Sequence, residues 1–207
     1  MSSVSRISAA IHAAYRQSAP RILLVGISGI DGAGKTFLAA NAAETLRREC
    51  LAVALLGLDD WRTPPAERYN LANPGEHFYR NAYNTRGLFE KLIEPLRQSG
   101  SISVEAQLFR RDGSAYTHPF AFSNVNVIVL EGSFLFTREL QNRFDLRIWI
   151  DCSFETALKR ALNRNQEGAP RGQLESDYET HYFPAQRFHM QADDPKSSAH
   201  LIISNDA

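Results

Sequence analysis

The sequence predicts an α/β fold of three layers, in which about five parallel strands are covered by helices on both faces. Five short apolar runs predict the strands, at residues 21–28, 51–58, 125–132, 145–151 and 199–204. These runs are continuously apolar rather than alternating, which is typical of parallel strands buried on both faces. Stretches with helical spacing lie between them, and this alternation of strand and helix is typical of an open, doubly wound sheet.

The segments between the strands predict three helices, at residues 36–50, 85–100 and 153–166. A fourth helix is expected over residues 1–20, because an apolar stripe from Val4 to Tyr15 is followed by Pro20. The alternative for this segment is a transit peptide, since it is rich in Ser and Ala and has no acidic residue. Residues 101–123 interrupt this alternation of strands and helices. Their alternating apolar and polar pattern and the turn sequence RRDG predict an inserted hairpin.

The amino-acid composition limits the classes of molecule that the protein is expected to bind. Lys+Arg and Asp+Glu both total 23, so no overall charge would attract a nucleic acid or an anionic membrane. No apolar run approaches the ~20 residues that a membrane span needs. The two cysteines lack the spacing of a disulfide framework or a zinc site, which suits a reducing compartment. We therefore expect a cytoplasmic, single-domain protein over residues 1–207 that binds a small-molecule substrate, with no nucleic-acid or membrane partner; a homo-oligomer stays open.

The most specific motif is GIDGAGKT, residues 29–36, which directly follows the first predicted strand. It matches G-x-x-x-x-G-K-[ST] in full and precedes a predicted helix, so the fold is expected to be of the P-loop NTPase type. In such a loop, backbone N–H groups point at phosphate oxygens, and glycine permits the close approach. A glycine-rich turn that binds nothing is the alternative. The expected nucleotide-binding residues are Gly29, Asp31, Gly32, Ala33, Gly34, Lys35 and Thr36.

The last two residues of this motif and three acidic residues at the ends of other predicted strands have separate expected tasks. Lys35 is expected to reach the β- and γ-phosphates, and the Thr36 hydroxyl to bind Mg²⁺. Glu131 ends a wholly apolar strand, where an acid can hold Mg²⁺ directly or through water. Asp59 and Asp60 follow the second strand, where a carboxylate could accept the proton of an attacking hydroxyl. They could equally cap the turn that the following prolines suggest.

The order of these motifs resembles the uridine kinase group, which includes phosphoribulokinase and nicotinamide riboside kinase. The resemblance covers residues 21 to 205 and consists of the P-loop, DDW, LEGSFLF and an arginine-bearing helix after WIDCS. It implies ATP- and Mg²⁺-dependent phosphorylation of a hydroxyl of a small metabolite, with a nucleoside or ribose-containing compound as the expected acceptor. It further implies that Asp59 is the catalytic base, close to the metal, with Asp60 and Trp61 beside it.

The resemblance also implies an arginine-bearing lid over residues 153–175. Arg160 and Arg164 lie one turn apart on the predicted helix and would stabilise the transferred phosphoryl group. Arg171 would join them at the nucleotide, from a mobile loop expected between Gly168 and Gly172. The alternative is a solvated basic helix face.

For the acceptor, the resemblance suggests three side chains. An aromatic–Asp pair binds ribose hydroxyls in the family, and here the matching residues are Tyr83 and Asn84. His118 lies in the hairpin where uridine kinases place a base-reading histidine. Asp177 stands where those enzymes often have an amide, which points away from uridine itself.

Two other hypotheses stay open. One is a nucleotide-binding regulatory or sensor protein that phosphorylates no acceptor, as Asn84 and Asp177 suggest. The other is a kinase of a coenzyme precursor such as pantothenate. The presence of Asp59, Glu131 and the arginines together favours a kinase, because a sensor needs no base.

Overall fold

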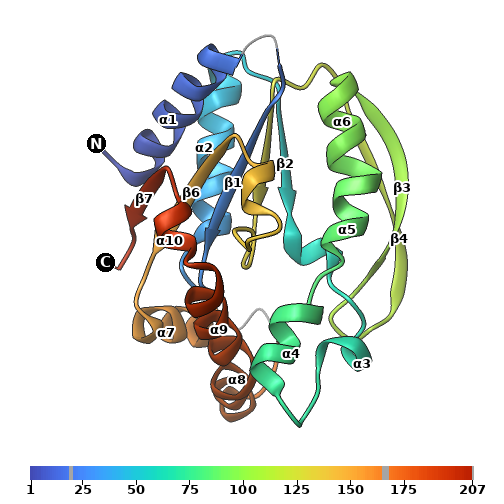
Figure 1. Ribbon diagram of the computed structural model, residues 1–207, viewed down its shortest axis with the longest axis vertical. Helices are drawn as coiled ribbons and strands as arrows, with labels where there is room; N and C mark the ends of the chain where they lie inside the picture. Colours follow the sequence, from blue (N-terminus) through green and yellow to red (C-terminus); the bar gives the residue numbers. More distant parts are fainter. Residues whose placement is uncertain (19–20, 165–167, 207) are drawn as a thin grey trace.

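Five parallel strands form the sheet at the centre of the protein, as the sequence predicts (Figure 1). The computed structural model describes residues 1–18, 21–164 and 168–206. Each predicted apolar run contributes one strand, and the order across the sheet is β2-β5-β1-β6-β7. The strands are β1 (Leu23–Gly29), β2 (Val53–Gly57), β5 (Val127–Glu131), β6 (Leu146–Asp151) and β7 (Leu201–Ser204).

The centre of the sheet is buried on both faces. All residues of β1 and of β5 are buried, and Val25 of β1 pairs with Val129 of β5 and Leu146 of β6. Because helices cover both faces, neither set of alternate side chains meets water, which explains why these segments are continuously apolar.

Helices α1 (Ser3–Ser18) and α2 (Lys35–Arg48) pack together on one face of the sheet (Figure 1). Ile7 and Ile11 of α1 are fully buried, so the N-terminal segment forms a packed helix. Pro20, which was expected to end it, lies outside the described residues. The other face carries the helix predicted at 85–100, which consists of α5 (Thr85–Leu88), the π-helical turn η2 (Phe89–Ile93) and α6 (Glu94–Ser99).

The two π-helical turns both precede a proline. In η2 the N–H of Glu94 donates to the carbonyl of Phe89, five residues back, and Pro95 follows. The same arrangement precedes Pro184, after η4 (Tyr178–Tyr182). A proline in a continuing helix has no N–H to give and its ring crowds the preceding turn, and a wider turn relieves both. The long apolar spacing alone did not predict these interruptions.

The inserted hairpin is present as predicted. Strands β3 (Ile102–Phe109) and β4 (Ala115–Phe122) pair antiparallel, apart from the main sheet and beside α6 (Figure 1). Its turn is closed by a hydrogen bond of 2.9 Å from the N–H of Arg110 to the carbonyl of Ser114.

Short helices gather beyond the carboxyl ends of the strands (Figure 1). The loop expected between Gly168 and Gly172 is shorter than predicted, because a helix begins at Arg171 directly after Pro170. Proline fixes its own φ near the helical value and is common at helix starts, which accounts for the early start. The helices beyond the carboxyl ends are α3 (Pro65–Arg68), α4 (Pro74–Asn81), α7 (Phe154–Arg164), α8 (Arg171–Asp177) and α9 (Phe183–Asp193), with the 3₁₀ turn η1 (Leu58–Trp61). The helix α10 (Pro195–Ser198) and the 3₁₀ turn η3 (Gln141–Arg143) instead precede β7 and β6 and lie near the start of β6.

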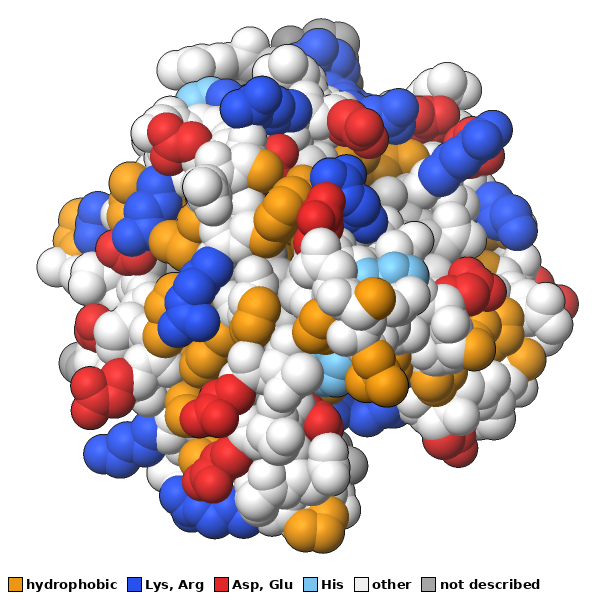
Figure 2. Space-filling model, turned by 60° about the horizontal axis from the view of Figure 1, so that its bottom comes forward, with side chains coloured by type: hydrophobic (Ala, Val, Ile, Leu, Met, Phe, Trp, Pro, Cys, Tyr) orange, Lys and Arg blue, Asp and Glu red, His pale blue; other side chains and the backbone are white. Residues whose placement is uncertain are grey.

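The surface reflects the balanced composition. On the face that Figure 2 brings forward, basic and acidic side chains are interspersed. None of the described helices combines the length and the apolar character needed to span a bilayer.

Gly32 marks a close contact that the fold requires. Its φ is +77°, and a Cβ added there would overlap the carbonyl oxygen of Ala157 in α7. The P-loop and α7 therefore approach each other closely only because residue 32 is glycine.

We expect Gly32→Ala to lower the free energy of unfolding by about 1–3 kcal/mol, since a strained conformation and a backbone clash are both introduced. Gly172→Ala is the matched control, because Gly172 lies in α8 with nothing within 4 Å of an added Cβ. Denaturant unfolding of both variants without ligand checks this. Equal effects of the two substitutions would contradict the role given to Gly32.

Candidate active site

A cavity of about 240 Å³ lies at the carboxyl ends of β1, β2 and β5. Ligands of open α/β sheets bind at this edge, because loops from neighbouring strands meet there. The cavity brings together side chains that are far apart in the sequence. Its lining residues are Asp31, Gly32, Gly34, Lys35, Thr36, Phe37, Asp59, Glu131, Gly132, Ser133, Arg160 and Arg164.

The P-loop is held from two sides. Gly29 ends β1, where a Cβ would collide with the carbonyl oxygen of Ile150 in β6. The side chain of Asn205 donates to the carbonyl of Ala33 at 2.8 Å, and the Asn205 carbonyl accepts from Arg160 at 2.8 Å. Asn205 thus connects the loop to the arginine of α7. No sequence motif marked it, since its partners lie far away in the chain.

Lys35 is buried, and its ammonium group is fixed at the cavity. Its Nζ donates to the carbonyl of Ile30 at 2.9 Å and to the hydroxyl of Ser133 at 3.2 Å. The Ser133 hydroxyl in turn donates to Asp31 at 2.8 Å, and Asp31 lies 3.8 Å from Nζ. A positive charge held in this way suits the binding of phosphate.

Ser133 is a residue that the sequence did not reveal. The backbone beside it has an unusual conformation, because the next residue, Phe134, has a φ of +63°. This conformation costs a bulky side chain about 1–3 kcal/mol. Phe134 is buried and packs edge-on against Tyr79 and His189, with ring centroids at 5.4 and 5.5 Å. This packing stabilises the turn that brings Ser133 to Lys35.

Thr36 and Glu131 form a pair of oxygen ligands. The Thr36 hydroxyl donates to Oε1 of Glu131 at 3.1 Å. Burial raises the pKa of Glu131 to about 7, while the charge of Lys35 opposes the rise. Within the described part of the chain, no cluster of three or more His, Cys, Asp or Glu side chains could hold a metal ion. Mg²⁺ bound with a nucleotide needs only one or two protein oxygens, so this pair fits the ion.

Asp59 is held from two directions. The hydroxyl of Tyr83 donates to its Oδ1 at 2.8 Å, and Arg62 lies 3.9 Å from its Oδ2. Burial and the carboxylate of Asp59 raise the pKa of Tyr83 well above its ordinary value, so the phenol remains a donor. The Asp59 side chain itself is 62% exposed and faces open space. Its neighbour Asp60 has a pKa raised mainly by burial and does not line this cavity.

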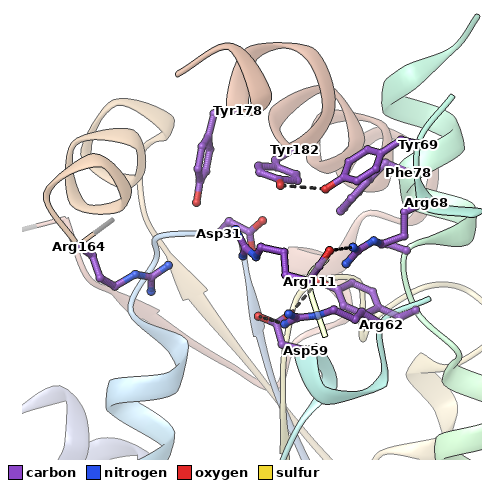
Figure 3. A pocket seen from close by; sticks show the side chains of 12 residues that line it. Asp31, Asp59, Arg62, Arg68, Tyr69, Phe78, Arg111, Arg164, Tyr178 and Tyr182 are labelled. Atoms are coloured by element: carbon purple, nitrogen blue, oxygen red, sulfur yellow. Dashed lines mark hydrogen bonds and ion pairs between the residues drawn. The ribbon is translucent and has the colours of Figure 1, made fainter. Parts of the chain in front are cut away.

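A second cavity, of about 60 Å³, adjoins the first and shares Asp31, Asp59 and Arg164 with it (Figure 3). Side chains from residues 62–83, from the hairpin turn and from η4 complete it. Most of these residues come from separate segments without a shared motif, so the sequence gives little indication of them. They are Arg62, Arg68, Tyr69, Phe78, Ala82, Tyr83, Arg111, Tyr178 and Tyr182.

Trp61, predicted to lie beside the base, packs against the hairpin, and the predicted acceptor ligand His118 belongs to the hairpin itself. Trp61 is 4% exposed and stacks on Phe120 of β4, with centroids 6.1 Å apart. His118 lies on β4, with its ring 4.6 Å from that of Phe120. Neither residue lines the two cavities. Trp61 instead fixes η1, and with it Asp59, against the hairpin.

Asn84 and Arg171 also lie outside both cavities. The side-chain oxygen of Asn84 accepts from the N–H of Gly87 at 2.8 Å and so caps α5. Arg171 is exposed and donates to Glu175 one turn along α8, at 3.1 Å. Asp177 accepts from Gln173 at 2.8 Å on the same helix. Of the predicted lid arginines, Arg160 and Arg164 line the first cavity.

The model of the Phosphoribulokinase / Uridine kinase family matches residues 24–205. The chain belongs to this family. It is 27% identical to the uridine kinase of Saccharomyces cerevisiae over 146 residues, which are 69% of this chain but only 28% of that relative. The chain therefore spans little more than a quarter of the curated relative.

Solved structures have the same fold. A protein described as a possible uridine kinase from Bacillus stearothermophilus superposes with a TM-score of 0.74, at 20% identity and over 97% of each chain. The D-glycerate 3-kinase of Cryptococcus neoformans superposes with a TM-score of 0.72, at 14% identity, over 97% of this chain and 95% of that one. This family of P-loop kinases is the one that the sequence resembles.

Glu131→Gln should stabilise the unliganded protein more at high pH than at low pH. The folded-state pKa of about 7 lies above the ordinary value of 4.5, so the folded state keeps a proton that the unfolded chain has lost. Stability therefore falls as the pH rises through this window, and glutamine has no proton to lose. We expect the gain in unfolding free energy to be on the order of 2 kcal/mol larger at pH 8 than at pH 5.

Denaturant unfolding at both pH values, without nucleotide or metal, measures this gain. Glutamine keeps an oxygen that can accept from Thr36, so the hydrogen bond is conserved in the comparison. A gain that does not depend on pH would show that Glu131 is not a buried, reluctantly ionised carboxyl.

Proposed function

We propose that the chain is an ATP- and Mg²⁺-dependent kinase that transfers a phosphoryl group to a hydroxyl of a small metabolite. The observation that supports this most directly is the position of Asp59, which lines both cavities. A carboxylate between a P-loop cavity and a second cavity can reach a hydroxyl bound in the second and directed at a phosphate bound in the first. A protein that only binds a nucleotide would have no use for such a group.

In the proposed mechanism, the first cavity holds the triphosphate. The backbone N–H groups of the P-loop and the ammonium of Lys35 would bind the β- and γ-phosphates, and the N-terminus of α2 adds its dipole. Thr36 and Glu131 would hold Mg²⁺, which neutralises charge on the phosphate oxygens when bound. Arg160 and Arg164 would stabilise the charge that develops on the transferred group, which is the main catalytic requirement of a loose transition state.

Asp59 acts on the acceptor side of the mechanism. Its carboxylate would take the proton of the attacking hydroxyl as the bond to phosphorus forms. Tyr83 and Arg62 hold that carboxylate from two directions, so it keeps one orientation while the substrates bind. Tyr83, predicted to bind the acceptor, would in this mechanism also position the base.

The class of acceptor is a finer question. A nucleoside or another ribose-containing compound is the class that the sequence predicts, and the curated relative is named a uridine kinase. A coenzyme precursor such as pantothenate would use the same catalytic groups. A regulatory protein without an acceptor is the remaining hypothesis, and the position of Asp59 argues against it.

Asp59→Asn should lower kcat by about 10²–10⁴-fold, the range expected when a general base is lost. ATP binding should stay nearly unchanged, because Asn has the same size and can still accept from Tyr83. The measurement is acceptor-stimulated ADP release with Mg·ATP, together with equilibrium binding of ATP.

Glu44→Gln is the control, since Glu44 is exposed on α2 and pairs with Arg48 at 3.2 Å. Near-normal turnover in Asp59→Asn would overturn the assignment of the base. ADP release that no hydroxylated acceptor stimulates, alongside tight ATP binding, would instead favour the regulatory hypothesis.

A further inference from the structure

Among the residues that the structure describes, those lining the second cavity carry more positive than negative charge. Arginines supply the positive groups, and the negative ones among these described residues are Asp31 and Asp59. Asp31 is already engaged by Ser133 and Lys35, and Asp59 is the proposed base. Figure 3 shows Arg164 on the P-loop side and Arg62 and Arg68 on the opposite side, with the side chain of Arg111 between them and directed toward Asp31. The mechanism above uses Arg62 to hold Asp59 and assigns no task to Arg68 or Arg111.

Arg68 is the most unusual of the three. It is only 5% exposed, and its Nε is buried without a hydrogen-bond partner. Its Nη2 donates to the backbone carbonyl of Arg111 at 2.8 Å, and its guanidinium lies 5.4 Å from the ring of Tyr69. No carboxylate among the residues that the structure describes forms an ion pair with it.

Burying such a charge without a counter-charge is expensive, and charged groups in protein interiors are normally paired. Burial also lowers the pKa of the Arg68 guanidinium below its ordinary value. The arrangement is therefore incomplete as a purely structural feature. A negative group entering the cavity would supply the missing partner.

The other side chains on this side of the cavity are also donors. The hydroxyls of Tyr69 and Tyr182 lie 3.1 Å apart, so only one of them can donate to the other, and the second proton is left for a ligand. Tyr182 is the last residue of the π-helical turn η4, and Pro184 follows in the first turn of α9. Guanidinium forks and phenol hydroxyls together match the oxygens of a carboxylate or a phosphate.

The size of the cavity agrees with a small acid group. Its volume is about 60 Å³, enough to admit more than one water-sized group. A carboxylate or phosphate group can enter such a space. Arg62 lies 3.9 Å from Asp59, so an anion bound by these arginines would be close to the reacting hydroxyl.

We propose that Arg62, Arg68 and Arg111 form an anion-binding subsite, and that the acceptor is a small hydroxylated acid with a carboxylate or phosphate group. A neutral nucleoside is then a poor substrate. This inference rests on the proposed function, because it takes Asp59 as the base that defines the acceptor side.

Matched pairs of acceptors test the substrate class. Each pair consists of an acid and its neutral counterpart: glycerate and glycerol, pantothenate and panthenol, ribose 5-phosphate and ribose, with uridine as the neutral nucleoside. ADP release with Mg·ATP measures turnover, and calorimetry with Mg²⁺ and a non-hydrolysable ATP analogue measures binding. We expect at least one acid to be preferred over its counterpart by about tenfold or more, because the neutral compound lacks the charged hydrogen bonds to the arginines. The carboxylate and phosphate pairs distinguish the two sources of charge.

The outcomes distinguish a failure of the proposed anion-binding subsite from a failure of the proposed kinase activity. Preference for neutral acceptors, or equal behaviour of both members of every pair in turnover and binding, overturns the anion subsite. Turnover with uridine alone would overturn it while leaving the kinase activity intact. Acid binding without any turnover would support the subsite and contradict the proposed kinase activity.

Arg111→Gln and its neighbour Arg110→Gln provide a matched pair of variants. Arg111 lines the cavity, whereas Arg110 lies over the ring of Tyr116 at 4.6 Å and does not. For the preferred acid, Arg111→Gln should raise the acceptor KM by about 10- to 100-fold and leave the KM for ATP unchanged. Arg111→Lys should recover part of the loss, and Arg110→Gln should change neither constant. Equal effects of the two Gln variants would contradict the proposal.

Discussion

The buried ammonium group of Lys35 is the charge around which the candidate site is arranged. A lysine in this position needs acceptors, and the protein supplies a carbonyl from the P-loop and the hydroxyl of Ser133. The strained turn at Phe134, the contact between Ser133 and Asp31, and the packing of Tyr79 all serve to place those acceptors. The same charge partly offsets the cost of burying Glu131.

Acidic groups lie around this charge at the ends of three neighbouring strands. Glu131 is buried and bonded to Thr36, whereas Asp59 is exposed and held by Tyr83 and Arg62. Their environments differ, and this difference divides their proposed tasks. The buried acid pairs with a hydroxyl ligand and suits a metal ion, and the exposed acid faces two cavities and suits proton transfer.

Much of the fold could be predicted from the sequence because it depends on local patterns. Continuous apolar runs reveal a sheet covered on both faces, and the complete P-loop motif fixes the first strand and the helix after it. The π-helical turns before Pro95 and Pro184 were not foreseen, because helical spacing over a long window averages out a single wide turn. The start of α8 at Arg171 was missed for a related reason: glycines near Pro170 suggested a loop where proline begins a helix.

The candidate site was predictable where one motif supplies a residue, and obscure where the tertiary fold brings residues together. Lys35, Thr36, Asp59 and Glu131 lie at or shortly after the carboxyl ends of strands, so one edge of the sheet brings them together. Other residues reach the site only through contacts with parts of the chain that are distant in sequence, as Asn205, Ser133 and Arg68 do. No motif or residue spacing predicts their positions. Trp61 illustrates the opposite case, since a residue beside the base packs into the hairpin rather than toward the cavity.

A crystal structure with Mg²⁺ and a non-hydrolysable ATP analogue would test the central claim most directly. The account predicts the γ-phosphate within hydrogen-bond distance of Lys35, the metal beside Thr36 and Glu131, and Asp59 facing the γ-phosphate across the mouth of the second cavity. A nucleotide whose terminal phosphate lies away from Lys35, or from which Asp59 points away, would contradict it.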